Sequence, residues 1–419
     1  MYLGAVMLEK IKLGINKLFT YYRRPIICDE CMWFIPERYP LLIKINLATA
    51  VVCDIINIPV NKLYEGGYRG YRNIEKIGRK LYLLPFAHNE LVSDIIGFDI
   101  DRKLFRNISI PNGLLREDEI LYKNDPGCVF YISLSHGKNI YLPSYAPVIL
   151  KFDTIDGKIT AHRQWKHNLF LDQHIDSFFV LDGNIEENGI IFPIYHTKYL
   201  VKFDVDLAKY QVYKIDNPDD DIENVFFVDD FYWIISNKQH RIIRWDKKSF
   251  QEIATINDDL CSIKDCVEVK NELWFFPYQS SMAICLRPEQ KNKLQINTEI
   301  PCLPKQKLRN IFQANYPGLS CHHNNIVYNV NPDMELLVAI NKATGEIIAK
   351  KINLPESLLK KCWSVLTDWQ YCFDSNGIYN GIFRETDFLI NNISALSKIW
   401  HMNVVPNNKC GEYIYKNII

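Results

Sequence analysis

The stretch from Ile140 to Asp153, IYLPSYAPVILKFD, carries a pattern that recurs along the chain. It begins with an aromatic-rich apolar strand closed by proline. A short polar turn follows, and then a second apolar strand that ends near Asp or Asn. Three close copies read MWFIPERYPLLIKIN from Met32, LYLLPFAHNELVSDIIGFD from Leu81 and IIFPIYHTKYLVKFD from Ile190. Looser copies begin at Phe231, Leu273 and Ile326.

The fuller copies contain four strand-like segments. The fifth reads NVFFVDD, FYWIISN, RIIRWD and QEIATIN between Asn224 and Asn257, and the fourth is predicted to begin with SFFVLDG from Ser177. A unit of four short strands repeated roughly every 40 to 60 residues is typical of a β-propeller. Seven copies followed by a divergent tail predict an all-β propeller of seven four-stranded blades. Six or eight blades are the alternatives.

On these motifs the chain resembles the β-propeller superfamily, and the repeated pattern is similar to that of bacterial propeller proteins. The resemblance implies the fold but no activity, since propellers serve unrelated functions. We expect an N-terminal helical segment at 1–24, the blades at 25–360, and a divergent segment at 361–419 that closes or wraps the ring. Closure removes exposed sheet edges, so we expect a monomer.

The charge balance argues against nucleic acid as a partner. Lys and Arg together number 49, as do Asp and Glu, so the formal net charge is +0 at pH 7. Binding to nucleic acid by counterion release needs clustered Lys and Arg, and the sequence has no such cluster.

The N-terminus and the cysteines predict the compartment. No run reaches about 18 apolar residues, so no integral membrane segment is predicted. Leu8, Ile11, Ile15 and Leu18 have helical spacing. They predict a short amphipathic helix over residues 7 to 20 that covers a face or edge of the propeller, with membrane-surface attachment as the alternative.

The chain contains 12 cysteines, and its sequence shows no export signal. This combination favours reduced thiols and predicts a cytoplasmic location.

The turns between the second and third strands predict a binding surface. In a propeller these turns lie on the same face as the inter-blade connections, and here they repeatedly carry aromatic residues and histidines. Amphipathic rings provide contact area for peptides and sugars at a low entropic cost. We predict that this face holds a peptide, glycan or protein partner, although each aromatic residue has packing between blades as its alternative role. The predicted residues are Tyr39, His88, Tyr145, Tyr195, His196, His240 and Tyr278.

An enzyme is the rival hypothesis. His88, His196 and His240 occupy equivalent turns, where they would converge if they served acid–base chemistry or held a metal ion. The sequence contains no P-loop, G-x-G-x-x-G, G-x-S-x-G or H-E-x-x-H motif. We therefore predict no cofactor and no metal site, name no catalytic residue, and leave open whether the protein is an enzyme. A lyase, isomerase or hydrolase would be the class.

Two other motifs are candidate sites. Cys28 and Cys31 form the one C-x-x-C pair, and zinc binding there would need partners such as Cys321 and His322 from the other end of the ring. Ser133, Ser135 and His136 resemble part of a hydrolase triad. Adjacent residues of a strand point to opposite faces, which argues against that assignment.

A last repeated feature is predicted to be structural. The third strand ends in Asp or Asn in almost every unit, and a residue needed once per blade is a turn device whose side chain caps the following hairpin. These residues are Asn46, Asp99, Asp153, Asp204, Asp246 and Asn341.

Overall fold

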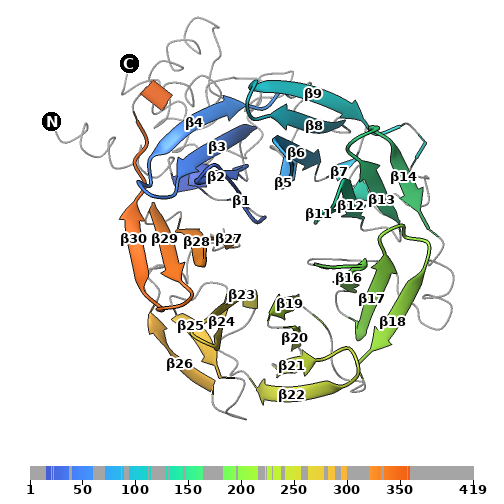
Figure 1. The fold of residues 1–419 in the computed structure, drawn as a ribbon, viewed down its shortest axis with the longest axis vertical. Helices are drawn as coiled ribbons and strands as arrows, with labels where there is room; N and C mark the ends of the chain where they lie inside the picture. Colours follow the sequence, from blue (N-terminus) through green and yellow to red (C-terminus); the bar gives the residue numbers. More distant parts are fainter. Residues whose placement is uncertain are drawn as a thin grey trace, which may run out of the picture.

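The protein is a seven-bladed β-propeller, as a computed structural model shows (Figure 1). Each blade is an antiparallel sheet of four strands, and the strand nearest the axis comes first in the sequence. The structure describes residues 16–19, 21, 23–36, 40–59, 71–85, 87–88, 94–111, 113–114, 128–130, 132–144, 148–163, 183–194, 197–215, 222, 224–228, 230–236, 241–255, 263–277, 282–287, 294–299, 320–331, 335–355 and 357–358.

A sheet with one solvent-exposed face alternates apolar and polar residues along each strand. The strands of the first four blades alternate less strictly, because both faces of a blade pack against neighbouring blades. Blade 1 comprises β1 (Ile26–Cys28), β2 (Cys31–Phe34), β3 (Leu41–Asn46) and β4 (Val52–Asn57). Blade 2 comprises β5 (Tyr71–Ile77), β6 (Lys80–Pro85), β8 (Asp94–Asp99) and β9 (Leu104–Ser109). Blade 3 comprises β11 (Leu134–His136), β12 (Asn139–Pro143), β13 (Ile149–Asp153) and β14 (Ile159–His162). Blade 4 comprises β15 (Asn184–Glu186), β16 (Gly189–Pro193), β17 (Tyr199–Asp204) and β18 (Tyr210–Lys214).

The remaining blades complete the ring. Blade 5 comprises β19 (Asn224–Val228), β20 (Phe231–Ser236), β21 (Arg241–Trp245) and β22 (Phe250–Thr255). Blade 6 comprises β23 (Ile263–Val269), β24 (Glu272–Pro277), β25 (Met282–Leu286) and β26 (Leu294–Glu299). Blade 7 comprises β27 (Cys321–His323), β28 (Ile326–Asn331), β29 (Leu336–Asn341) and β30 (Ile347–Lys351). A separate two-stranded ribbon joins β7 (Ala87–His88) to β10 (Cys128–Val129).

The first strand of blade 4 corrects one expectation. The apolar run from Ser177 was predicted as that strand, whereas the innermost strand is the short polar segment Asn184–Glu186. An inner strand faces the axis along one edge and therefore tolerates polar side chains that a buried strand would not.

Aromatic and aliphatic side chains fill the seams between blades. Seven clusters of buried residues are found in the described part of the chain, one at each seam. Between blades 1 and 2, the ring centroids of Trp33 and Phe98 are 6.0 Å apart. Between blades 2 and 3, those of Tyr82 and Phe152 are 5.5 Å apart. Burial of these large side chains drives the stacking of blades.

The described part of the N-terminal segment packs into the closing seam and contains no α-helix. Asn16–Phe19 form a single 3-10 turn, while residues 1–15 lie outside the described residues. Leu18, Phe19 and Tyr21 are all buried between blades 7 and 1. Neighbouring residues buried in this way do not share one face of an α-helix, which explains why the amphipathic prediction is not supported here.

Main-chain hydrogen bonds close the ring. The amide of Val52 donates to the carbonyl of Asn353 at 2.9 Å, and the amide of Asn353 donates to the carbonyl of Ala50 at 2.9 Å. All four strands of each described blade come from consecutive sequence between Ile26 and Lys351. The segment 361–419 lies outside the described residues, so its predicted role at the ring stays a prediction.

The turn-capping prediction is confirmed. In blade 5 the Asp246 carboxylate accepts hydrogen bonds from the amides of Lys248 at 2.8 Å and Ser249 at 2.7 Å. In blade 7 the Asn341 side chain accepts from the amides of Ala343 and Thr344 at 3.0 and 3.1 Å. Asn46, Asp99, Asp153 and Asp204 cap their own turns in the same way.

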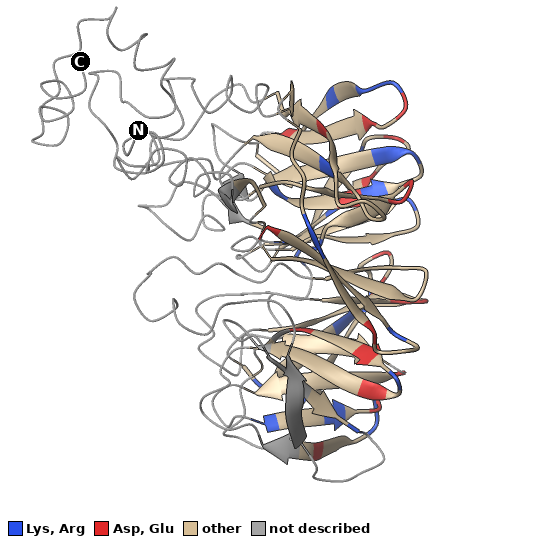
Figure 2. Cartoon of the chain, turned by 90° about the vertical axis from the view of Figure 1, so that its left-hand side faces the viewer, with Lys and Arg blue, Asp and Glu red and all other residues tan. Residues whose placement is uncertain are grey.

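The described outer surface carries charges of both signs. Figure 2 shows acidic and basic residues side by side along the turns at one end of the blades. Within the described residues, no helix is long and apolar enough to cross a membrane.

Candidate functional site

Most residues of the predicted binding surface lie outside the described part of the chain. Among them only His88 belongs to a described element: its main chain pairs with Cys128 in the β7–β10 ribbon, while its side chain is not described. The predicted surface on the strand 2–3 turns therefore stays a prediction. The other predicted residues, all outside the described residues, are Tyr39, Tyr145, Tyr195, His196, His240 and Tyr278.

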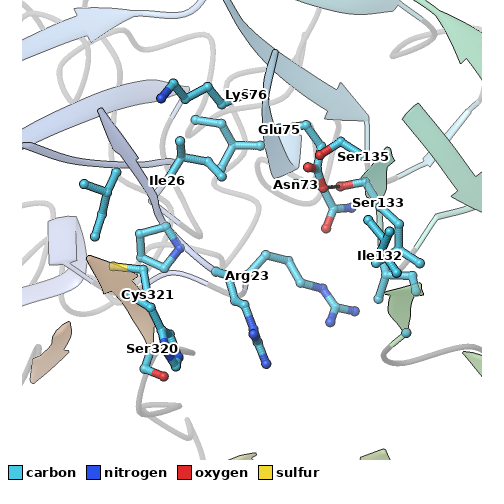
Figure 3. Close-up of a pocket in the computed structure, with 18 of the residues that line it drawn as sticks. Arg23, Ile26, Asn73, Glu75, Lys76, Ile132, Ser133, Ser135, Ser320 and Cys321 are labelled. Carbon is cyan, nitrogen blue, oxygen red and sulfur yellow. Dashed lines mark hydrogen bonds between the residues drawn. The ribbon is translucent and has the colours of Figure 1, made fainter. Parts of the chain in front are cut away.

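The described residues do form a cavity of about 500 Å³ at the centre of the ring, which we call the axial cavity. Its lining comes from the segment 23–27 and from the innermost strands β5, β11, β15 and β27 with the residues just before them (Figure 3). Five blades thus contribute to one cavity. Among the described residues, only those of the inner strands, of the positions just before them and of the N-terminal segment line it.

The cavity lies towards the end of the ring where the strand 2–3 turns are predicted. Strand register pairs Tyr71, at the start of β5, with Pro85 at the end of β6. It likewise pairs Ile263, at the start of β23, with Pro277 at the end of β24. The lining includes the residues just before β11, β15 and β27, which lie on this side of the ring, and on β5 it extends over residues 73–76.

One wall of the cavity is acidic and rich in hydroxyl groups. The Ser133 Oγ donates a hydrogen bond to Oε1 of Glu75 at 2.6 Å, and the Ser135 hydroxyl also bonds this carboxyl group. Burial raises the pKa of Glu75, and the two serine hydrogen bonds oppose that rise without cancelling it. Figure 3 shows Glu75, Ser133 and Ser135 together on one side of the cavity. We call these three residues the Glu75 wall.

The Glu75 wall is held in place by its neighbours in the sheet. On the same face of β5, the buried Asn73 side chain donates to the carbonyl of Phe130 at 3.3 Å, across the seam from blade 2 to blade 3. Ser133 and Ser135 are two residues apart, so both point to one side of their strand. The serine hydroxyls and the carboxyl group therefore meet across the seam between blades 2 and 3, in the lining of the axial cavity.

Arginine side chains bring positive charge to the cavity from the N-terminal segment. Arg23 and Arg24 both line it, and the Arg24 guanidinium pairs with the Asp265 carboxylate, Nη2 to Oδ1, at 3.2 Å. Asp265 is buried, and its other oxygen accepts the amide hydrogen bond of Ser320 at 2.7 Å and that of the Ser320 hydroxyl. The carboxylate thus joins the N-terminal segment, blade 6 and blade 7.

His322 and Cys321 lie on β27 beside these arginines. Burial lowers the pKa of His322, and the nearby Asp265 carboxylate only partly offsets that effect. Burial likewise raises the pKa of the Cys321 thiol. Both side chains are therefore neutral near pH 7, so His322 offers one hydrogen-bond donor and one acceptor to the cavity.

The described residues do not assemble the zinc set considered from the sequence. β1 and β27 are neighbours in the closed ring, as expected. However, Cys28 and Cys31 are buried in the seam between blades 1 and 2, while Cys321 is buried in the seam between blades 7 and 1. Blade 1 separates them. Among the described residues, no group of three His, Cys, Asp or Glu side chains is placed to hold a metal ion.

The sequence offered one signal for the axial cavity. Asn73 and Glu75 alternate on one short strand, and Ser133 and Ser135 alternate on the equivalent segment of the next blade. Polar residues at every second position share one side of a strand. The sequence analysis treats Ser133, Ser135 and His136 as part of a triad, and Glu75 is not among its predicted site residues.

Comparison with solved structures supports the fold. A catalytically inactive virginiamycin B lyase from Staphylococcus aureus with quinupristin matches 75% of this chain and 94% of its own, with a TM-score of 0.53 and 12% identity. YCF48 bound to D1 peptide matches 80% of this chain and 94% of its own, with a TM-score of 0.49 and 9% identity. At such identities the likeness concerns the propeller alone. No protein-family model matches the sequence, and no curated protein matches it.

Proposed function

We propose that this propeller is a binding module that holds a peptide segment of a partner protein in the axial cavity. The residues predicted on the strand 2–3 turns, among them Tyr195 and His196, would form the rim around that segment. The observation that carries the proposal is the presence of both charge types in the lining of one cavity, Glu75 together with Arg23 and Arg24. A peptide supplies both charges as well as polar main chain, which favours it over an uncharged glycan.

The backbone of the ring supports the same proposal. Each innermost strand pairs with one neighbour only, so in the described sheets its other edge faces the axis. Main-chain donors and acceptors at a sheet edge are suited to an extended peptide. Apolar side chains between the polar ones, such as Ile132 and Leu134, provide contact area for the side chains of the ligand.

The location is part of the proposal. Cys28 and Cys31 face each other across the β1–β2 hairpin and remain thiols. Reduced cysteines fit a reducing compartment, and we therefore propose that the protein works in the cytoplasm. We propose a monomer because the closed ring leaves few exposed sheet edges for pairing between molecules.

A peptide-display selection on the intact protein tests this function. Peptides recovered with the wild-type protein are measured by fluorescence anisotropy against Ser135→Trp, which fills the cavity, and against Ile155→Trp. Ile155 is 78% exposed on an outer turn and serves as the matched control. We expect Ser135→Trp to weaken binding at least about tenfold while Ile155→Trp leaves it unchanged. Equal binding by all three proteins would refute the cavity as the site.

An enzyme remains the second candidate function, favoured by one observation. Glu75 is a cavity-facing carboxylic acid with a raised pKa, which is the property of a general acid. Incubating a selected peptide with the wild-type protein and with Glu75→Gln, followed by mass spectrometry, tests this candidate. Conversion by the wild-type protein alone would support catalysis, and an unchanged peptide in both samples would leave the binding function.

A further inference from the structure

The axial cavity is lined by the Glu75 carboxyl group and by the basic side chains of Arg23, Arg24 and Lys76. Among the described residues, the hydrogen-bond partners of Glu75 are the hydroxyls of Ser133 and Ser135, and no ion pair joins it to a cation. The Arg24 guanidinium pairs instead with Asp265 at 3.2 Å.

The Glu75 carboxyl group is half-buried and lines the cavity without a counter-ion among the described residues, so it is suited to receive a cation. Ionised and unpaired, it would be costly in such an environment; paired with a cation, it is stabilised. We propose that the Glu75 wall binds a protonated primary amine of the ligand. This inference rests on the proposed binding function, and it specifies which chemical group of the ligand the cavity recognises.

The geometry of the wall suits an ammonium group. A carboxylate has about four acceptor positions on its two oxygens, and Ser133, at 2.6 Å, and Ser135 occupy two of them. Each serine hydroxyl keeps lone pairs of its own. Together they offer converging acceptors for the three donors of an ammonium group. A lysine side chain, a peptide amino terminus and a free diamine share this chemistry.

The other titratable groups around Glu75 do not compete with an incoming amine. Its partner across the sheet on β6 is Tyr82, whose phenol has a pKa raised by burial, and the residues that bond it from blade 3 are Ser133, just before β11, and Ser135 on β11. The remaining ionisable residues of the lining are Arg23, Arg24, Lys76, Cys321, His322 and His323. Lys76 is the next residue on β5, and Arg24 pairs with Asp265 at 3.2 Å.

Amine binding requires the ionised carboxylate, so its pH dependence has a defined sign. The raised pKa keeps Glu75 protonated at acidic pH, and binding there must first remove that proton. Affinity for an amine therefore increases as the pH rises through the pKa of Glu75. Protonation of His322 at acidic pH acts in the same direction, because it adds positive charge to the cavity.

Three probes of equal length test the proposal: 1,5-diaminopentane, 1,5-pentanediol and glutarate. Isothermal titration calorimetry on the intact protein is expected to show binding of the diamine, with an affinity at least about tenfold above that of the diol and of glutarate. Glu75→Gln should remove that preference, while Glu346→Gln, on an exposed turn of blade 7, should retain it. Ser133→Ala is a milder change to the same wall, and we expect it to reduce the preference for the diamine to an intermediate value.

The outcomes separate this inference from the proposed function. If selected peptides bind in a Ser135→Trp-sensitive manner but the diamine binds no better than the diol, the amine assignment is wrong and the cavity still binds peptides. Stronger binding of glutarate than of the diamine would overturn it as well. Thermal unfolding of Glu75→Gln and Ser133→Ala verifies that the variants are folded, and one folded variant is sufficient for the test.

Discussion

The Arg24 guanidinium lies 3.2 Å from the Asp265 carboxylate, Nη2 to Oδ1, and this ion pair ties the N-terminal segment to blade 6. The two residues are 241 positions apart in the sequence. Asp265 also accepts hydrogen bonds from Ser320 at the start of blade 7. One buried carboxylate therefore fixes three parts of the ring beside the axial cavity.

Replacing Asp265 by Ala should destabilise the propeller by about 2 to 4 kcal/mol, because a buried acceptor of several charged and neutral hydrogen bonds is lost. Urea unfolding measures the change. Asp206 provides the control: it pairs with Lys151 at 2.9 Å but is 78% exposed, so Asp206→Ala should cost less than about 1 kcal/mol. Equal effects of both substitutions would contradict the role of Asp265.

The seam between blades 7 and 1 should depend on the N-terminal segment. Phe19 is buried there with Leu18 and Tyr21, so Phe19→Ala should lower the free energy of unfolding by about 3 to 5 kcal/mol. Leu104, 62% exposed on β9, is the matched position where substitution by Ala should have little effect. A loss below about 1 kcal/mol for Phe19→Ala would show that the ring closes without this segment.

Glu186 predicts a specific acid sensitivity. Burial would raise the pKa of Glu186, but hydrogen bonds from Lys202, Tyr232 and Lys247 outweigh it and lower the pKa from 4.5 to about 2. The Nζ atom of Lys247 is 2.9 Å from Oε1 of Glu186. A carboxylate whose pKa is lowered by folding stabilises the protein above its unfolded pKa, and this contribution is lost as the pH falls from 4.5 towards 2.

The measurement for Glu186 is the free energy of unfolding between pH 6 and pH 2. The wild-type protein should lose stability more steeply below pH 4.5 than Glu186→Gln, which has no group to protonate at this position. Glu346→Gln, on an exposed turn, should follow the wild-type curve. Parallel curves for the wild type and Glu186→Gln would refute the assignment.

Gly189 should be intolerant of any side chain because of a close main-chain approach. A Cβ atom there would overlap the carbonyl oxygen of Phe203 on the paired strand. Gly189→Ala should therefore cost at least about 2 kcal/mol. Gly137 has a φ of +58° and open space around it, so Gly137→Ala should cost only about 1 kcal/mol of backbone strain. Thermal unfolding of both variants measures the difference, and Gly189→Ala should lower the melting temperature more than Gly137→Ala.

The architecture was predictable because each blade repeats the same local sequence pattern. Proline closes the second strand and Asp or Asn caps the turn after the third, so residues such as Pro143 and Asp153 mark a blade by themselves. Strands buried on both faces are apolar throughout, as in Ile190–Phe192. Seven blades and the capping role follow from these residues, and both predictions are confirmed.

The axial cavity was harder to predict because its strands carry little local signal. β11, β15 and β27 have three residues each, which is too short for a periodic pattern. The partners of Glu75 and Asp265 come from other blades or from the N-terminal segment, so the sequence separations are 58 residues to Ser133 and 241 to Arg24. The first contact depends on the stacking of blades 2 and 3 and the second on ring closure, neither of which local sequence encodes.

The most direct test of the axial cavity as the binding site is a crystal structure of the protein with the tightest peptide from the selection. The account predicts peptide density within the ring, with a primary amine about 3 Å from the Glu75 carboxylate and in reach of Ser133. Peptide density confined to the outer surface, with the cavity holding only solvent, would contradict it.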